Sequence, residues 1–211
     1  ISSAVRSGPN KRVVFAEGEE PSVIRAAWGF KQAELGTPIL VGREDLIRQN
    51  AAEAGLNFDE LGIEITNARV SGRNAEYTDW LYAKLQRRGY LRRDVQRMIN
   101  QDRNIFGAVL LQLGHADAMI TGITRTYAQS MREIRRVLSP APGRTPFGVH
   151  VLVGQSHTVF IADTTVNERP TAEQLADIAV SSAETAARFG IEPRVALLSY
   201  STGDSGTGAD V

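Results

Sequence analysis

The sequence contains no cysteine among its 211 residues. This absence excludes disulfide bonds, a thiolate nucleophile and a cysteine-ligated zinc cluster. The three histidines, His115, His150 and His157, are scattered without metal-ligand spacing, so we expect no metal site. No apolar run reaches the length that spans a membrane, and the first residues lack a signal-peptide pattern. We therefore expect a cytoplasmic protein without a membrane partner.

An excess of charge of one sign is also missing, because 24 Lys and Arg residues balance 24 Asp and Glu residues. A balanced chain does not favour binding to nucleic acid or to an anionic membrane. Lysine is scarce and occurs only at Lys11, Lys31 and Lys84. Most of the positive charge is therefore arginine, which forms forked contacts with phosphate or carboxylate groups, although a GC-rich genome also raises the arginine content.

Short β-branched runs alternate with helical patterns in the first half of the chain. The expected strands are residues 12–16, 38–41, 63–65 and 117–120, and the expected helices are residues 21–36, 44–54, 77–88, 94–100 and 105–113. This alternation predicts an α/β fold in which a parallel sheet is flanked by helices. In such sheets the ligand crevice lies beyond the carboxyl ends of the strands.

The second half begins after the Pro/Gly-rich break around Pro142, so we expect a subdomain boundary there, between residues 1–141 and 142–211. Residues 149–153 and 158–162 predict a hairpin. A helix is expected at 171–189, where Thr171 and Gln174 have capping-box spacing. Residues 195–198 predict a last buried strand. The chain starts with Ile1 and ends in a Gly/Ser/Thr-rich run, so we expect it to be part of a longer polypeptide.

Residues 117–142 carry the strongest functional pattern, a strand, a turn and a helix. Free backbone N–H groups and the positive end of a helix dipole suit this turn to an anion, and arginine adds donors for phosphate. The alternative is a surface loop followed by a solvated helix. The small, hydroxylic and basic residues of this stretch are Thr121, Gly122, Thr124, Thr126, Ser130, Arg132, Arg135 and Arg136.

Several other groups are weaker candidates, each with a structural alternative. Hydroxyls after the last expected strand either contact a ligand phosphate or cap a helix. Asp163, Thr164 and Asn167 line a cleft or form an Asx turn, and residues 203–208 are better explained as a linker than as a phosphate loop. The hydroxyl-bearing residues after the last expected strand are Ser199, Ser201 and Thr202. A basic run could contact the ligand's phosphates, but a solvated surface is the favoured interpretation; its members are Arg87, Arg88, Arg92, Arg93 and Arg97.

Four segments together resemble the phosphate acetyltransferase family. They are K-R-V-V-F-A-E-G-E at 11–19, F-G-A-V-L-L-Q-L-G-H-A-D-A-M-I-T-G at 106–122, A-D-T-T-V-N-E-R-P-T-A-E-Q-L-A-D-I-A at 162–179 and G-I-E-P-R-V-A-L-L-S-Y-S-T at 190–202. The segments follow family order over nearly the whole chain. The resemblance implies a two-lobed α/β fold, with the second lobe incomplete in this chain, whose cleft binds coenzyme A and its acyl ester.

The family usually carries a segment close to H-T-T-A-D-T-x-R-P after the strand that precedes the turn. Residues 125–133 of this chain keep Thr126, Ala128 and Arg132 of that pattern, and Ser130 keeps a hydroxyl. The His, Asp and Pro of the pattern are replaced by Arg125, Gln129 and Glu133. Acetyl transfer to phosphate needs a group that manages the thiol proton, so these departures bear on turnover.

The departures are similar to those of a relative in which this domain follows a bacterial NADP-dependent malic enzyme. That resemblance implies an acetyl-CoA-binding regulatory domain in a homo-oligomer, with NADP and metal held only by a malic portion outside this chain. The alternatives are an active phosphate acetyltransferase, whose further Ser-Arg and Asp features lie beyond Val211, and a module that only assembles the oligomer. We assign no catalytic residue, and the predicted ligand contacts are Thr121, Gly122, Thr126, Ser130, Arg132, Ser199, Ser201 and Thr202.

Overall fold

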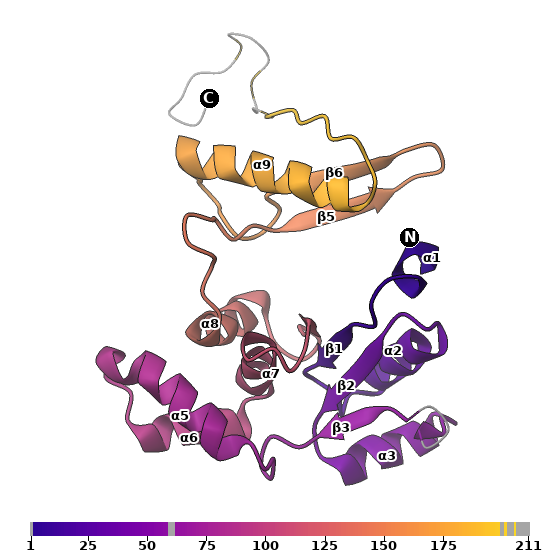
Figure 1. Cartoon of the computed structure of the whole chain (residues 1–211), viewed down its shortest axis with the longest axis vertical. Helices are drawn as coiled ribbons and strands as arrows, with labels where there is room; N and C mark the ends of the chain where they lie inside the picture. The colour runs from indigo at the N-terminus through magenta and orange to yellow at the C-terminus, as the bar shows by residue number, and fades with distance from the viewer. Residues whose placement is uncertain (1, 59–61, 199–200, 202–204, 206–211) are drawn as a thin grey trace. The chain divides into compact units, whose positions relative to one another are not determined.

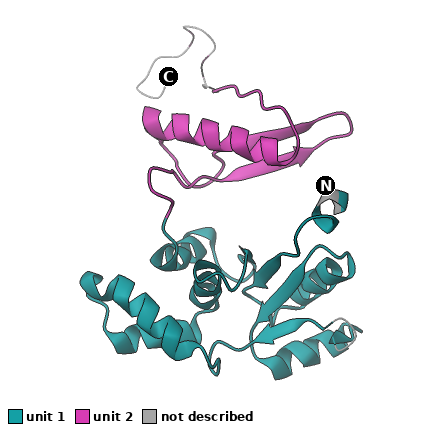
Figure 2. Ribbon diagram, viewed as in Figure 1, with its two compact units in different colours: residues 1–139 teal, residues 140–211 magenta. Residues whose placement is uncertain are grey.

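The computed structural model describes residues 2–58 and 62–198 together with Ser201 and Ser205. The chain divides into two compact units, Ile1–Ser139 and Pro140–Val211, which Figure 2 colours separately. The division follows Ser139, whereas the sequence analysis placed it after Ala141. No helix in the described part of the chain is both long and apolar enough to cross a membrane.

Unit 1 is built on a four-stranded parallel sheet (Figure 1). Its strands are β1 (Arg12–Phe15), β2 (Thr37–Val41), β3 (Glu64–Thr66) and β4 (Ala118–Ile120), in the order β3-β2-β1-β4. Strand β1 pairs in parallel with β2 and β4, and β2 pairs in parallel with β3. The predicted parallel sheet is thus confirmed. Its strand order reverses between β1 and β4, where open α/β sheets leave a crevice for a ligand.

The helices of unit 1 lie close to their predicted positions. The α2 helix stops before Gly36, the predicted end, because a bend into β2 follows it. A Cβ atom at Gly36 would lie 2.4 Å from the carbonyl oxygen of Lys11, so only glycine fits this bend. The helical elements described are α1 (Ser2–Arg6), α2 (Pro21–Gln32), α3 (Glu44–Glu53), α5 (Asn74–Leu85), the 3₁₀ turn η1 (Gln86–Arg88), α6 (Arg92–Gln101), α7 (Arg103–Gln112) and α8 (Tyr127–Val137).

Side-chain alternation along the strands gives the sheet two buried faces. Val13 and Phe15 pack with α2 and α3 in one apolar cluster. Val14 and Val41 pack with α5, α6 and α7 in a second cluster. Since successive residues of a strand point to opposite sides, a sheet covered on both faces requires apolar residues at every position. This explains the unbroken apolar runs of β1 and β2.

Unit 2 contains a hairpin and one long helix (Figure 1). Strands β5 (Val149–Val153) and β6 (Thr158–Ala162) pair antiparallel, which confirms the predicted hairpin. Helix α9 (Ala172–Arg188) starts with the predicted capping box, in which the Thr171 and Gln174 side chains each bond to the other residue's backbone N–H. The rings of Phe160 and Phe189 meet edge to face at 5.3 Å between centroids and join β6 to the end of α9.

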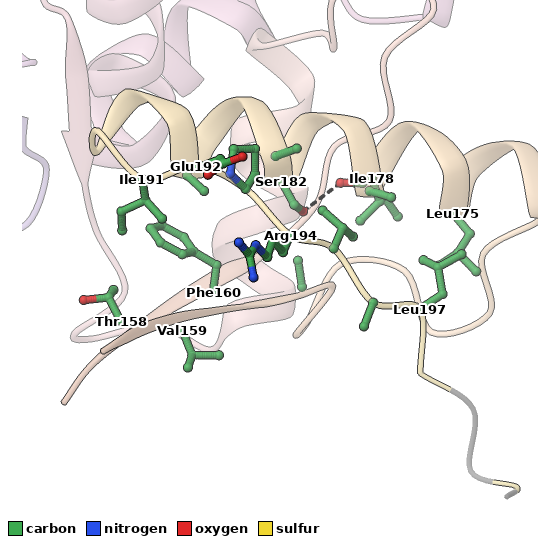
Figure 3. Close-up of a pocket in the computed structure, with 17 residues that line it drawn as sticks. Thr158, Val159, Phe160, Leu175, Ile178, Ser182, Ile191, Glu192, Arg194 and Leu197 are labelled. Atoms are coloured by element: carbon green, nitrogen blue, oxygen red, sulfur yellow. Dashed lines mark hydrogen bonds between the residues drawn. The ribbon is translucent and has the colours of Figure 1, made fainter. Parts of the chain in front are cut away.

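The prediction of a last buried strand at residues 195–198 is wrong. This segment forms no strand, and Val195, Leu197 and Leu198 are exposed. A strand needs a neighbour that accepts its backbone hydrogen bonds, and within the described residues no strand pairs with this segment. Its apolar side chains instead line one wall of a cavity of about 340 Å³ against β6 and α9, where Figure 3 shows Leu197 opposite Ile178 and Leu175.

Asp163 organises the loop that follows β6. Its carboxylate accepts hydrogen bonds from the backbone N–H groups of Gly148, Thr165, Val166 and Asn167 at 2.7–3.1 Å and from the Asn167 side chain. Burial raises the pKa of Asp163, but these donors outweigh burial and lower the pKa to about 2. The predicted Asx turn explains this residue, so its role is to hold the loop against β5.

Replacing Asp163 with alanine is expected to destabilise unit 2 by about 1–2 kcal/mol at neutral pH, after allowance for solvent screening. The pKa of Asp163 is lower in the folded state, so its contribution is complete above about pH 4 and is lost as the pH falls towards 2. Urea unfolding followed by circular dichroism measures this effect. A difference between wild type and Asp163→Ala that stayed constant from pH 7 to pH 3 would contradict the prediction.

Candidate functional site

The candidate site of unit 1 is the loop of residues 121–126, which joins β4 to α8. Thr121 directly follows β4, and Thr126 is the N-cap of α8. The backbone N–H of Ala16 donates to the carbonyl of Ile120 at 3.0 Å, which continues the pairing of β1 with β4. The loop therefore lies at the carboxyl ends of β1 and β4, where the strand order reverses.

The carboxylate of Glu17 occupies the amide-lined turn of this loop. It accepts hydrogen bonds from the backbone N–H groups of Gly122, Ile123 and Thr124 at 2.7–2.9 Å, and from the Thr124 hydroxyl at 2.5 Å. Burial raises the pKa of Glu17, but these donors outweigh it and hold the pKa below its ordinary value. The amide of Gly122, which the sequence analysis assigned to a ligand anion, is therefore taken by the protein's own carboxylate.

Five polar side chains beside this turn form one network, which we call the Arg125 network: Asp102, Asn104, Thr121, Arg125 and Glu133. Nη1 of Arg125 lies 2.8 Å from Oδ2 of Asp102 and 2.5 Å from Oε2 of Glu133. Asn104 donates from Nδ2 to Oε2 of Glu133 at 2.9 Å and accepts from the Thr121 hydroxyl at 2.5 Å. The network thus ties the loop to the start of α7 and to the middle of α8.

Arg125 and Glu133, at the centre of the Arg125 network, both stay charged because their hydrogen-bond partners favour the charged forms. Burial lowers the pKa of Arg125, but Asp102 and Glu133 outweigh it and raise the pKa above its ordinary value. Burial raises the pKa of Glu133, but Asn104 and Arg125 outweigh it and lower the pKa. The side chain of Glu133 is only 7% exposed. Arg125 and Glu133 therefore form a largely buried ion pair at neutral pH.

The predicted contacts on α8 lie on different faces of the helix. Thr126 caps α8, its hydroxyl accepting from the backbone N–H of Gln129 at 3.3 Å. Ser130 is buried, and its hydroxyl has no hydrogen-bond partner among the described residues. Arg132 is exposed and has no ion-pair partner among them. Residues two apart on a helix point in different directions, so Ser130 and Arg132 do not face one ligand from the same side.

The remaining predicted contacts belong to unit 2. Ser199 and Thr202 lie outside the described residues. The hydroxyl of Ser201 lies 3.4 Å from that of Ser205. The structure therefore leaves the prediction of a phosphate contact at these hydroxyls open.

The basic run on and around η1 is exposed, as predicted for a solvated face. The members Arg87, Arg88, Arg92, Arg93 and Arg97 are all exposed. Arg92 pairs with Asp79 across α5 and α6, at 2.6 Å between Nη2 and Oδ1. Within residues 2–58 and 62–198, no three acidic or histidine side chains come together as metal ligands.

Three residues of the site were missed by the sequence analysis: Glu17, Asp102 and Asn104. Asp102 had a local signal, because an aspartate before an apolar helix is a common N-cap and here accepts from the amides of Asn104 and Ile105. The acidic stretch at Glu17 was interpreted only as the opening of α2. No local signal links Glu17 to a turn 105–107 residues later in the chain.

Comparison with known proteins identifies this combination of sheet, loop and helix. The family model described as phosphate acetyl/butaryl transferase matches residues 1–211, the full length of the chain. The chain belongs to the phosphate acetyl/butaryl transferase family. The three residues that differ from the family's loop pattern lie next to one another in the structure. Arg125 forms an ion pair with Glu133, and Nε2 of Gln129 donates to Oε1 of Glu133 at 3.3 Å.

Relatives of this chain include both malic enzymes and transferases. The chain is 50% identical over 202 residues to an NADP-dependent malic enzyme of Rhizobium meliloti, covering 96% of this chain and 26% of that protein. It is 35% identical over 201 residues to a phosphate acetyltransferase of Nitratidesulfovibrio vulgaris, covering 95% of this chain and 28% of that protein. The chain thus spans about a quarter of the length of these curated relatives.

A solved structure confirms the predicted fold class. The EutD phosphotransacetylase from Staphylococcus aureus superposes with a TM-score of 0.86 and 27% sequence identity, covering 99% of this chain and 62% of that chain. The predicted α/β architecture of the phosphate acetyltransferase type is therefore correct.

Proposed function

We propose that this chain is an acetyl-CoA-binding regulatory module of a bacterial NADP-dependent malic enzyme. A separate portion of the polypeptide carries out the oxidative decarboxylation of malate to pyruvate and holds NADP and a divalent metal. The complete protein is a cytoplasmic homo-oligomer, a dimer or higher. The 50% identity to a malic enzyme, of which this chain covers 26%, supports a module within a longer enzyme.

The observation that carries the proposal is that the residues that differ from the family's loop pattern interact with each other. Arg125, Gln129 and Glu133 stand where the family pattern has His, Asp and Pro, and Glu133 bonds to both Arg125 and Gln129. Residues that pair in this way satisfy each other's charges and hydrogen bonds. The pairing supports a loop that is maintained as a structure, without the groups that the transfer reaction requires.

The chemistry of the substituted groups supports binding without turnover. A general base must lose its proton near the working pH. The guanidinium of Arg125 does not, because Asp102 and Glu133 raise its pKa above an already high value. Glu133 is a poor replacement, since Arg125 and Asn104 lower its pKa and occupy its Oε2 atom. In the proposed role the site binds acetyl-CoA through Arg132 of α8, and the loop supplies no group that manages the proton of the thiol.

Arg132 is the group that we assign to the phosphate portion of acetyl-CoA, as the arginine that matches the family pattern. Its guanidinium is exposed and has no ion-pair partner in the described part of the chain, so it is available to a ligand. The Thr121 and Thr126 hydroxyls serve mainly to shape the loop, through Asn104 and the helix cap respectively. Ser199, Ser201 and Thr202 remain assigned as secondary contacts, whereas Ser130 is buried and does not face the ligand side of Arg132. Regulation requires that acetyl-CoA bind two states of the enzyme with different affinities.

Arg132→Ala in the complete polypeptide is expected to weaken acetyl-CoA binding about tenfold or more. A hydrogen bond to a charged group contributes about 1.5–3 kcal/mol. Isothermal titration calorimetry measures the dissociation constant. Arg25→Ala is the control, because Arg25 is an exposed arginine of α2 that lies outside residues 117–142. Equal dissociation constants for Arg132→Ala and wild type would contradict the assignment, and acetyl-CoA binding that left malic activity unchanged would contradict the regulatory role.

The rival function is an active phosphate acetyltransferase, which moves the acetyl group between coenzyme A and phosphate. The transferase relatives favour it. Arsenate-dependent loss of acetyl-CoA in the complete protein distinguishes the two, because an active transferase makes acetyl arsenate, which hydrolyses at once. Absence of any coenzyme A ester binding would instead favour a module that only assembles the oligomer.

A further inference from the structure

A polar cavity of unit 1 lies along the same edge of the sheet as the loop of residues 121–126. It has a volume of about 230 Å³ and is lined by side chains that follow three neighbouring strands. Glu19 comes after β1, Arg43 after β2, and Asn67 and Arg69 after β3. Arg103, the first residue of α7, completes the wall. The carboxyl ends of parallel strands are the edge at which α/β sheets bind ligands.

The cavity has an excess of positive charge. Three guanidinium groups, those of Arg43, Arg69 and Arg103, face a single carboxylate, that of Glu19. Oε2 of Glu19 lies 2.5 Å from Nη2 of Arg103, and its Oε1 accepts from Nε of Arg43 at 3.3 Å. The negative charge of Asp45, in the first turn of α3, helps to raise the pKa of Arg43, but Asp45 does not line the cavity. The lining residues therefore carry two positive charges more than negative ones.

Glu19 holds two of the arginines in place and leaves the third available. The Glu19 side chain is only 11% exposed, and it also accepts from the backbone N–H of Arg43 at 2.8 Å. The guanidinium of Arg69 forms no hydrogen bond or ion pair with the described residues, whereas the backbone N–H of Arg69 donates to Oδ1 of Asn67 at 3.0 Å. Asn67 and Gln101 add side-chain amide donors to the wall. An anion in this cavity would contact Arg43 and Arg103, which Glu19 holds in place, and the guanidinium of Arg69.

We propose that this cavity binds a phosphoryl group through Arg43, Arg69 and Arg103. Planar guanidinium groups form paired hydrogen bonds with phosphate oxygens, which suits a group with several charged oxygens better than a single carboxylate. Cavities that enclose whole drug-sized ligands measure about 300–1,000 Å³, so this one takes a terminal phosphate or a pyrophosphate. The site shares no residue with the Arg132 contact of the proposed function, so each can fail without the other.

The test uses inorganic pyrophosphate as the probe, titrated into the complete polypeptide by calorimetry at low ionic strength. Arg69→Ala is expected to weaken pyrophosphate binding about tenfold. This variant keeps the fold, because Arg69 makes no side-chain bond that folding needs. Arg25→Ala, an exposed arginine of α2 that does not line the cavity, is the control and should bind as wild type does. Arg132→Ala should also retain pyrophosphate binding.

Equal pyrophosphate dissociation constants for wild type and Arg69→Ala would overturn the proposal. Loss of pyrophosphate binding in Arg132→Ala but not in Arg69→Ala would overturn it as well. Competition then identifies the source of the phosphoryl group. Displacement of pyrophosphate by coenzyme A but not by dephospho-coenzyme A supports a site for the nucleotide's 3′-phosphate. Displacement by neither, with the Arg69→Ala effect present, supports a site for a small phosphorylated compound.

Discussion

Glu17→Ala is expected to lower the free energy of unfolding by about 3–5 kcal/mol, which is one of the two largest effects that we predict for a single substitution in this chain. The carboxylate is 3% exposed and accepts from three backbone amides and one hydroxyl. Each buried donor left without a partner costs about 1–3 kcal/mol, and water that enters the site recovers part of this cost. Since domains are stable by about 5–15 kcal/mol, the loss is a large share of the total.

Tryptophan fluorescence during denaturant unfolding measures this effect, because both tryptophans of the chain, Trp28 and Trp80, lie in unit 1. Glu17→Gln keeps the shape but removes the charge, so its loss should be smaller. Glu20→Ala is the control, since the Glu20 side chain caps no backbone amide of α2. A Glu17→Ala protein within about 1 kcal/mol of wild type would show that the turn closes without the carboxylate.

The Glu17 contribution should also depend on pH. The donors hold the pKa of Glu17 in the folded protein below its value in the unfolded chain. The stabilisation is therefore complete above the unfolded pKa of about 4.3 and is lost as the pH falls through the folded pKa. The stability difference between wild type and Glu17→Gln should accordingly shrink in acid.

Arg125→Ala is the second large effect, with an expected loss of about 3–5 kcal/mol. Removing one partner of a buried ion pair leaves the other as an uncompensated charge. Here Glu133, with a side chain 7% exposed, and Asp102, with a side chain 19% exposed, would both lose the guanidinium. Asn104 and Gln129 still donate to Glu133, but neither supplies a positive charge.

A double-mutant cycle distinguishes the loss of the ion pair from the loss of the packing volume of the Arg125 side chain. The double variant Arg125→Ala/Glu133→Gln removes both charges and should be more stable than Arg125→Ala alone, with a coupling energy of about 1–3 kcal/mol. Arg135→Ala, on the exposed face of α8, is the control and should change stability by less than about 0.5 kcal/mol. Additive losses in the cycle would show that Arg125 and Glu133 do not interact as the geometry indicates.

The elements of the fold were predictable wherever their pattern is local. Continuous apolar runs identified β1 and β2, and the spacing of Thr171 and Gln174 identified the start of α9. The turn of four residues between β5 and β6 identified the hairpin. The segment 195–198 was predicted wrongly, because an apolar composition is shared by a buried strand and by an irregular segment that lines a cavity.

The sequence by itself determined the fold class and the family, since both depend on patterns that neighbouring residues carry. It also determined which loop residues depart from the family, namely Arg125, Gln129 and Glu133. Only the tertiary structure decided that Arg125 pairs with Glu133 and Asp102 and that Glu17 occupies the amides of the loop. The physical reason is distance along the chain: Glu17 and its donors are separated by 105–107 residues, and Arg125 and Asp102 by 23. Glu17 meets its donors only when the parallel strands β1 and β4 bring their carboxyl ends to one edge of the sheet, and Asp102 meets Arg125 only when the start of α7 packs beside the loop.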